Sequence, residues 1–578
     1  MDHRRAGSPL LLLALLLPSC FLVALLLAGC GSVAHAAPRP VFAFPAAAKV
    51  QASSRSHPRH ERLRVALDAA AARVGQALAA MVAAAAVDPA SSDDAPASTR
   101  TPLAAAARED CAELLEEALA LLAGAGAAAR DDALTWLSAA LTNHDTCADG
   151  LAEAGAVAPG CGAPHHAHAH LAAARAAVRD SLAMYDASTA VDTAATRTAR
   201  PGTTEDGCHC NNETRREGVC GFPRWLPARD RRLLLTPAAS LAASADIVVA
   251  KDGTGTHATI TDAVKAAPEC SERRTVILVK AGRYEENVKV GMRKTNLVFV
   301  GDGKGVTVVA GTRSVADRNY TTFRTATFAA SGFGFMMRDM TVENASGPAR
   351  HQAVALRVSA DRAVVHRCAV AGYQDTLYAH SNRQFYRDCD VYGTVDAVFG
   401  NAAAVLQRCT LWARAPLSSQ KNTVTAQNRN ESCQRTGIVL HACRLLPAPD
   451  LLAAPSPSPA LSPSPAPAQE QEQRAATYLG RPWRPYSRVV VMMSYIGAHV
   501  APRGWLEWNA SAYALDTLYY GEYMNYGPGA GVAGRVRWPG HRVINDTEEA
   551  ERFTVARFIA GASWLPATGV SFVPGLSL

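Results

Sequence analysis

The chain has 578 residues, which is too long for one ordinary compact domain and predicts two folded units with connecting segments. No stretch beyond the N-terminus is expected to span a bilayer, which argues against a multi-span membrane protein. The net charge of +7 is concentrated after residue 246, where 36 Lys and Arg accompany 27 Asp and Glu. A basic domain attracts polyanions, whether acidic polysaccharide, nucleic acid or a membrane surface.

Residues 1–37 are predicted to be a secretory signal. His3, Arg4 and Arg5 precede an apolar run over 10–27, and small residues up to Ala36 form a candidate cleavage site. Because the run is long, an uncleaved membrane anchor is the alternative.

Cysteine and sequon content also favours an extracellular destination. Fourteen cysteines, two of them inside the signal, leave twelve for an oxidising compartment. Six Asn-X-Ser/Thr sequons add support, because they are glycosylated only on the secretory route, and they lie at Asn212, Asn319, Asn344, Asn430, Asn509 and Asn545.

Residues 50–190 are predicted to form a helical bundle. Apolar residues recur at intervals of three and four, as in "CAELLEEALALLAGAGAAARDDALTWLSAALTNHDTCADGL". Cys111 and Cys147 fall on successive predicted helices, so one disulfide is expected to clamp that hairpin.

Residues 191–245 are predicted to be a linker. Arg231 and Arg232, within "ARDRRLLL", form a dibasic pair that is a candidate protease site. Cleavage there would separate the two units.

From residue 246 to residue 578 the pattern changes to short β runs punctuated by Gly, Asn and Asp. Cys368, Cys389 and Cys409 stand 21 and 20 residues apart in weakly repeated segments. A period near this length without intervening helices predicts a parallel β-helix, in which residues one period apart stack. A β-sandwich is the alternative. A Pro/Ser-rich insertion over 454–473 cannot pack a core.

Two carboxylates within this repeat are candidates for chemistry. Asp375 and Asp396 are 21 residues apart, so the period places them on adjacent rungs. Such a pair can share a proton, flank a glycosidic bond, or divide into nucleophile and acid. Gln374 and Gln352 would add amide donors for a developing oxyanion, which favours acyl transfer.

The segment "YLGRPWRPYSR" supplies Arg481 and Trp483. An Arg can hold one Asp ionised through paired hydrogen bonds, and a Trp ring can stack on a sugar. A structural salt bridge and a packed core aromatic are the alternatives for these two residues.

Five collinear blocks resemble the signature blocks of plant-type pectin methylesterases, and they are "GRYEENV", "HQAVALR", "GYQDTLYAHSNRQFYRDC", "GTVDAVFGNA" and "YLGRPW". The similarity runs from about residue 246 to the C-terminus. The segment "TWLSAALTNHDTC" resembles the pectin methylesterase inhibitor domain of longer members, and "RRLL" resembles their processing site.

The resemblance implies an all-β right-handed parallel β-helix, preceded by an all-α pro-domain, that hydrolyses the methyl esters of homogalacturonan to pectate and methanol. It implies that Asp396 is the nucleophile and that Asp375 is first the acid and then the base. It also implies that Gln352 and Gln374 stabilise the oxyanion, Arg481 orients Asp396, and Trp483 contacts substrate. No metal, organic cofactor or nucleic-acid partner is implied.

The sequence departs from the family pattern in three places. Ala397 stands where an aromatic is usual, and is expected to loosen substrate packing or lower the rate. The helical region lacks the first cysteine pair expected near residues 50–70, and the insertion directly precedes "YLGRPW".

The predicted partners are methyl-esterified homogalacturonan, the helical region of the same chain and, transiently, a membrane. The expected location is the cell wall outside the cell. Two rival functions are a polysaccharide lyase or glycosidase on the same solenoid, and a non-catalytic pectin-binding or inhibitor protein.

Overall fold

The computed structural model describes residues 58–86, 101–155, 163–196, 245–453, 476–509 and 511–576. The predicted signal segment, the Arg231–Arg232 pair and the Pro/Ser-rich insertion lie outside these residues.

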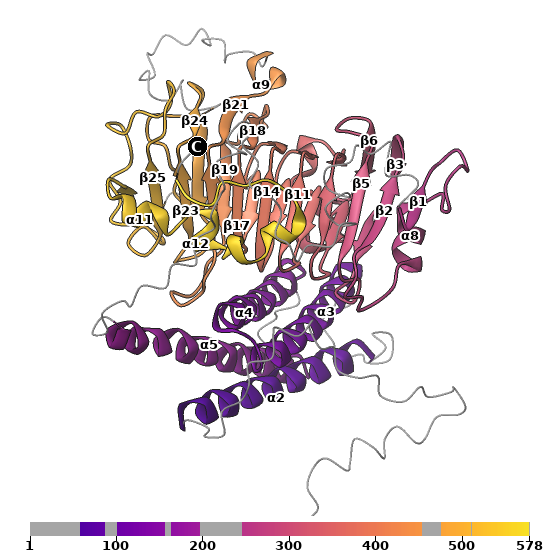
Figure 1. Ribbon diagram of the computed structural model, residues 1–578, viewed down its shortest axis with the longest axis vertical. Helices are drawn as coiled ribbons and strands as arrows, with labels where there is room; N and C mark the ends of the chain where they lie inside the picture. The colour runs from indigo at the N-terminus through magenta and orange to yellow at the C-terminus, as the bar shows by residue number, and fades with distance from the viewer. Residues whose placement is uncertain are drawn as a thin grey trace, which may run out of the picture. The chain divides into compact units, whose positions relative to one another are not determined.

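Four long helices form the N-terminal part (Figure 1): α2 (Pro58–Ala86), α3 (Pro102–Ala125), α4 (Arg130–Glu153) and α5 (Ala163–Thr196). α3 begins at a side-chain cap, where Thr101 accepts a hydrogen bond from the Ala104 amide and Pro102 occupies the first turn. α5 continues to Thr196, inside the segment predicted as a linker.

The helices pack through small and branched apolar side chains, and Cys111 of α3 is bonded to Cys147 of α4. The Cα atoms of these two cysteines are 4.5 Å apart. The predicted disulfide clamp is therefore confirmed.

One finding differs from the expectation about membrane-spanning segments. Among the described residues, the stretch Glu61–Ala83 of α2 is long and apolar enough to cross a membrane. One side of it, however, is buried in the bundle through Leu67, Ala70, Val74, Ala77 and Met81.

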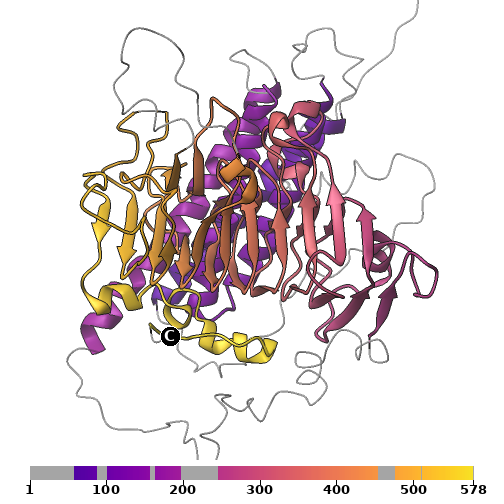
Figure 2. The ribbon, with the colours of Figure 1, turned by 90° about the horizontal axis from the view of Figure 1, so that it is seen from above.

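The C-terminal part is a parallel β-helix (Figures 1 and 2), because the described strands pair in parallel and each complete rung adds one strand to each of three sheets. The predicted fold is confirmed, and a β-sandwich, which needs antiparallel sheets, is wrong. The eleven-stranded sheet contains β1 (Ile247–Val249), β2 (Thr275–Val279), β5 (Leu297–Gly301), β8 (Met336–Arg338), β11 (Ala363–His366), β14 (Arg383–Arg387), β17 (Ala403–Gln407), β20 (Gly437–His441), β23 (Arg488–Met492), β25 (Tyr519–Tyr523) and β26 (His541–Val543).

The other two sheets are shorter. The eight-stranded sheet contains β3 (Gly282–Glu285), β6 (Thr307–Gly311), β9 (Thr341–Asn344), β12 (Ala369–Ala371), β15 (Asp390–Gly393), β18 (Thr410–Ala413), β21 (Arg444–Pro447) and β24 (Tyr495–Ile496). The seven-stranded sheet contains β4 (Val288–Val290), β7 (Phe328–Ala330), β10 (Leu356–Val358), β13 (Leu377–Ala379), β16 (Val398–Gly400), β19 (Asn422–Gln427) and β22 (Thr477–Pro482).

Several short helices lie between and after the strands of the β-helix. The α-helical ones are α8 (Ile260–Ala266), α9 (Pro449–Ala453), α11 (Thr547–Glu551) and α12 (Val555–Phe558). The 3₁₀ turns are η2 (Val315–Asp317), η3 (Thr322–Thr325), η4 (Pro348–Arg350), η5 (Gly561–Ser563) and η6 (Leu565–Thr568).

The cysteine period matches the rungs. Strand register aligns Ala369 with Asp390, Asp390 with Thr410, and Thr410 with Arg444. The residues just before them are Cys368, Cys389, Cys409 and Cys443, which therefore occupy one position on four successive rungs, and all four are buried.

One predicted sequon is not available in the folded chain. Asn344 is 2% exposed, and its side-chain amide donates hydrogen bonds to the carbonyls of Arg313 and Val354. A glycan cannot occupy this side chain without disrupting those contacts.

Candidate active site

Asp375 and Asp396 lie at the same corner of successive rungs, two residues before β13 and β16. Leu377 pairs with Val398, and neighbouring strands lie about 4.8 Å apart. Both aspartates have left-handed backbones, with φ of 62° and 53°. Asp tolerates this conformation better than most residues do, so the corner projects two short carboxylates side by side.

Asp396 is held as a carboxylate. Its Oδ1 accepts hydrogen bonds from the Thr423 hydroxyl at 2.6 Å and Arg481 Nε at 2.9 Å, and its Oδ2 accepts from Arg481 Nη2 at 2.6 Å. Although burial disfavours the charged guanidinium, Asp396 raises the pKa of Arg481. This two-pronged pairing fixes the orientation of the carboxylate.

Asp375 is in the opposite electrostatic situation. It is 7% exposed, and burial together with the neighbouring Asp396 charge raises its pKa well above the ordinary value. Arg481 opposes this shift but does not outweigh it. One carboxylic acid and one carboxylate therefore stand side by side.

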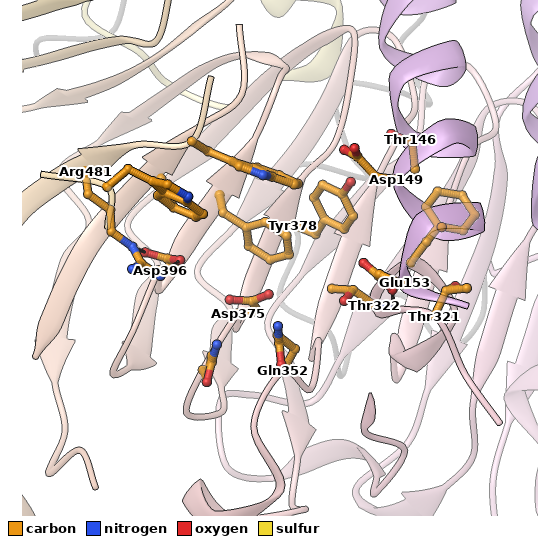
Figure 3. A pocket seen from close by; sticks show the side chains of 17 residues that line it. Thr146, Asp149, Glu153, Thr321, Thr322, Gln352, Asp375, Tyr378, Asp396 and Arg481 are labelled. Carbon is orange, nitrogen blue, oxygen red and sulfur yellow. Dashed lines mark hydrogen bonds and ion pairs between the residues drawn. The ribbon is translucent and has the colours of Figure 1, made fainter. Parts of the chain in front are cut away.

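Two amides border the acid. Gln352 lies next to Asp375 with its amide nitrogen turned toward it (Figure 3). The Gln374 carbonyl oxygen accepts a hydrogen bond from Gln420 at 3.2 Å, which leaves its NH₂ group available as a donor. Gln374 and Gln352 therefore both line the cavity beside Asp375.

All six residues singled out by the sequence line one cavity of about 220 Å³. Aromatic rings form its walls: Tyr378 and Phe399 stack with centroids 4.2 Å apart, and Trp483 lies 6.0 Å from Phe399. Within the described residues, no group of three or more His, Cys, Asp or Glu side chains is arranged to hold a metal ion.

Three contributors were missed by sequence reasoning. Thr423 bonds Asp396, Gln420 bonds Gln374, and the Trp508 ring lies 4.2 Å from the Arg481 guanidinium. None falls in a block that signals chemistry, and each reaches the site only through the winding of the chain.

The expectation for Ala397 is wrong in its mechanism. Ala397 is buried and does not line the catalytic cavity; it faces a small internal space together with Gly393, Leu411 and Val424. Alanine here therefore affects packing inside the corner of the rung, and the expected lower rate stays a prediction.

The helix α4 forms one side of the site (Figure 3). Thr146, Asp149, Gly150 and Glu153 line the same cavity, and Figure 3 shows the two carboxylates projecting from the helix toward it. Glu153 accepts a hydrogen bond from the Thr322 amide at 2.9 Å, and Asp149 pairs with Arg484. Burial raises the pKa of both carboxyls.

Comparisons with known proteins agree with this architecture. Residues 246–562 match the family model described as Pectinesterase, and residues 43–184 match the model described as Plant invertase/pectin methylesterase inhibitor. A similar relative is probable pectinesterase/pectinesterase inhibitor 34 of Arabidopsis thaliana, 52% identical over 82% of this chain and 75% of its own length. Pectinesterase 2.1 of Solanum lycopersicum is 45% identical over 81% of this chain and 78% of its own length.

Among solved structures, the pectin methylesterase from carrot superposes with a TM-score of 0.53 at 49% identity. The match covers 57% of this chain and 98% of the carrot chain.

A parallel β-helix with an acid, a carboxylate and amide donors in one cavity defines a carboxylic ester hydrolase rather than a lyase or a binding module. The chain belongs to the pectinesterase family. It hydrolyses the methyl esters of homogalacturonan to pectate and methanol, and the rival functions are not favoured.

Proposed function

We propose that Asp396 is the nucleophile of this hydrolysis. Its carboxylate attacks the ester carbonyl carbon of a galacturonate unit, and the carbonyl oxygen becomes an oxyanion held by the amides of Gln352 and Gln374. As this intermediate collapses, the carbon–oxygen bond to methoxide breaks and Asp375 gives its proton to the departing methanol. The product is an anhydride between Asp396 and the galacturonate carboxyl.

The second half-reaction reverses the role of Asp375. Now a carboxylate, it takes a proton from water, whose oxygen attacks the galacturonate carbonyl carbon of the anhydride. The bond to Asp396 breaks, pectate leaves, and Asp396 returns to its pairing with Arg481. Because the same group is acid and then base, one proton cycles through Asp375 in each turnover.

The observation that carries this assignment is the contrast between the two carboxyls. Arg481 and Thr423 together donate three hydrogen bonds to Asp396, while Asp375 has its pKa raised by burial and by the neighbouring charge. Trp483 stands at the cavity wall, where its ring can stack on the sugar. We place the reaction in the cell wall, with residues 1–37 directing export.

The test is methanol release from highly methyl-esterified homogalacturonan. The folded full chain carries a specific protease sequence in place of residues 229–234, and it is cleaved and freed of the helical fragment before assay. Asp396→Asn should lower kcat by at least about a thousandfold, because an amide is a poor nucleophile. Asp388→Asn is the matched control: it changes the same side chain at a rung corner outside the cavity and should keep parental activity. Equal activity in Asp396→Asn and parent would refute the assignment.

A second function is favoured by the position of α4. We propose that the helical region inhibits the esterase of its own chain, and that cleavage in the linker, at Arg231 and Arg232, allows its release. Thr146, Asp149, Gly150 and Glu153 of α4 line the catalytic cavity of about 220 Å³, so the helix takes up one side of the space that a polysaccharide would enter. Methanol release should therefore be low in the intact chain and rise when the helical fragment is separated. Equal activity of both forms would exclude inhibition.

A further inference from the structure

A row of basic side chains extends from the catalytic cavity along the seven-stranded sheet. Strand register aligns Lys289, Ala329, Arg357, Tyr378, Phe399, Ala426 and Arg481 in one column across all seven strands. Tyr378, Phe399 and Arg481 line the catalytic cavity. Arg357 is one strand beyond Tyr378, and Lys289 is two strands further, roughly 10 Å along the solenoid.

A second cavity lies over this row. It has a volume of about 300 Å³ and is lined by Lys289, Arg313, Arg324 and Arg357 of the β-helix. Phe323 lines both this cavity and the catalytic one, so the two are neighbours on one face.

The acidic face of α3 covers the row. Glu109, Asp110, Glu113 and Glu117 recur at helical spacing and face the basic side chains. Arg324 donates to Asp110 at 2.7 Å and to Glu109 at 2.8 Å, while Lys289 pairs with Glu113. A line of carboxylates on α3 therefore lies against a group of cations on the β-helix.

Arg357 shows that this match is incomplete. It is 3% exposed, and its guanidinium lies 3.2 Å from the centre of the Phe323 ring. Within the part of the chain that the structure describes, its Nε and Nη1 atoms have no hydrogen-bond acceptor. Leaving charged donors unsatisfied is costly, so α3 is an imperfect occupant of a site built for anions.

We propose that Lys289, Arg324 and Arg357 form a binding track for the free carboxylates of already de-esterified galacturonate units, and that α3 occupies this track in the uncleaved chain. The inference rests on the ester hydrolysis described above, because that reaction makes the polyanion that the track would bind. Guanidinium groups pair well with planar carboxylates.

The track is tested on the β-helix obtained by cutting the folded full chain at the inserted protease sequence and removing the helical fragment. Calorimetry measures the affinity of a fully de-esterified decagalacturonate and of its fully methyl-esterified counterpart. Lys289→Gln and Arg324→Gln should each weaken decagalacturonate binding roughly tenfold, and the methyl-esterified oligomer by much less, because hydrogen bonds to charged groups are lost. Arg357→Gln should act in the same direction.

Lys265→Gln is the matched control, since it removes an exposed positive charge on α8, outside the row. It should leave both affinities unchanged. Because Lys289 is exposed, its replacement should not prevent folding even if that of buried Arg357 does.

Unchanged decagalacturonate affinity in the Lys289 and Arg324 variants would overturn the track, and so would equal weakening of both oligomers. Methanol release is measured on the same parental sample. A parent that binds decagalacturonate but releases no methanol would refute the catalytic assignment while leaving the track in place.

Discussion

Four buried acids of the helical bundle differ from buried Glu522 of the β-helix in how well they are paired. In the helical bundle, burial raises the pKa of Asp110, Asp149, Glu153 and Glu117, the last to about 7. In the β-helix, burial has the same tendency at Glu522, but hydrogen bonds from His541, Arg535 and Trp505 outweigh it and lower the pKa.

The difference shows where buried carboxylates are fully paired and where they are not. Glu522 and its hydrogen-bond partners all belong to the β-helix, so its hydrogen bonds form within one folded unit. Asp110, Glu117 and Asp149 meet cations of the β-helix and Glu153 meets a backbone amide there, and these contacts do not fully compensate for lost hydration. The interface is therefore less well satisfied than the core of the β-helix, as separable parts require.

The largest effect is expected when the hydrogen-bond network around Glu522 is broken. Arg535→Met leaves the Glu522 carboxylate buried without its main cation, and both side chains are only 2% exposed. We expect a loss of about 3–5 kcal/mol in the free energy of unfolding, measured by denaturant titration. Arg542→Met, which breaks an exposed pair with Glu549, should cost less than about 1 kcal/mol. Similar losses for both variants would contradict the comparison.

A smaller effect separates the stabilities of the two parts. Replacing Cys111 and Cys147 by Ser opens a loop of 36 residues within the bundle. We expect the helical part to lose about 2–4 kcal/mol, while unfolding of the β-helix is unchanged. Calorimetry on the cleaved and separated fragments measures each part. An equal shift in both fragments would show that the effect is not confined to the bundle.

The interface is expected to weaken as pH rises. Glu117 faces Glu113 on its own helix and Arg357, Lys289 and Ser331 on the β-helix. The pKa of Glu117 is raised to about 7 when the helical part is docked. Its protonated side chain therefore contributes fully to docking below the pKa that it has in the separated fragment, and this contribution is lost as pH rises through about 7. We expect the dissociation constant of the separated fragments to increase roughly tenfold to hundredfold between pH 5 and pH 8.

Glu117→Gln is the control for this pH dependence. It keeps the shape of the side chain but cannot ionise, so the increase should become smaller. An unchanged dissociation constant across the pH range in the parent would contradict the role of these acids.

The smallest expected effect tests one neutral contact. The Thr146 hydroxyl lies 2.9 Å from Nε2 of buried His380, and burial lowers the pKa of that imidazole, so the ring is neutral. Thr146→Val should weaken fragment docking by about 1 kcal/mol. Thr135→Val, whose hydroxyl bonds Asp131 within its own helix, should leave docking unchanged. Equal effects would mean that the contact with His380 contributes nothing specific.

Much of the solenoid was predictable because its repeat is local in sequence. The spacing of Cys368, Cys389 and Cys409 reports the length of one rung, and the same spacing brings Asp375 beside Asp396. Periodicity likewise predicted the helical hairpin closed by Cys111 and Cys147. In each case the residue spacing within one continuous segment was sufficient to predict the contact.

Contacts between distant segments were not predictable. Thr423 is 27 residues from Asp396, across a turn whose length no repeat specifies. The contacts of α3 with Lys289 and Arg324 join residues that are more than a hundred positions apart in the sequence. Surface helix patterns also do not distinguish a solvated acidic face from one that docks on another domain.

The sequence by itself determined the two architectures, the stacked carboxylates and the presence of their amide and guanidinium partners, because stacking and helical periodicity act over one repeat. Only the tertiary structure decided that burial is the largest cause of the raised Asp375 pKa, that α4 lines the cavity and that a basic row lies beneath α3. These depend on desolvation and on charges brought together from separate segments, and neither is encoded at any single position in the chain.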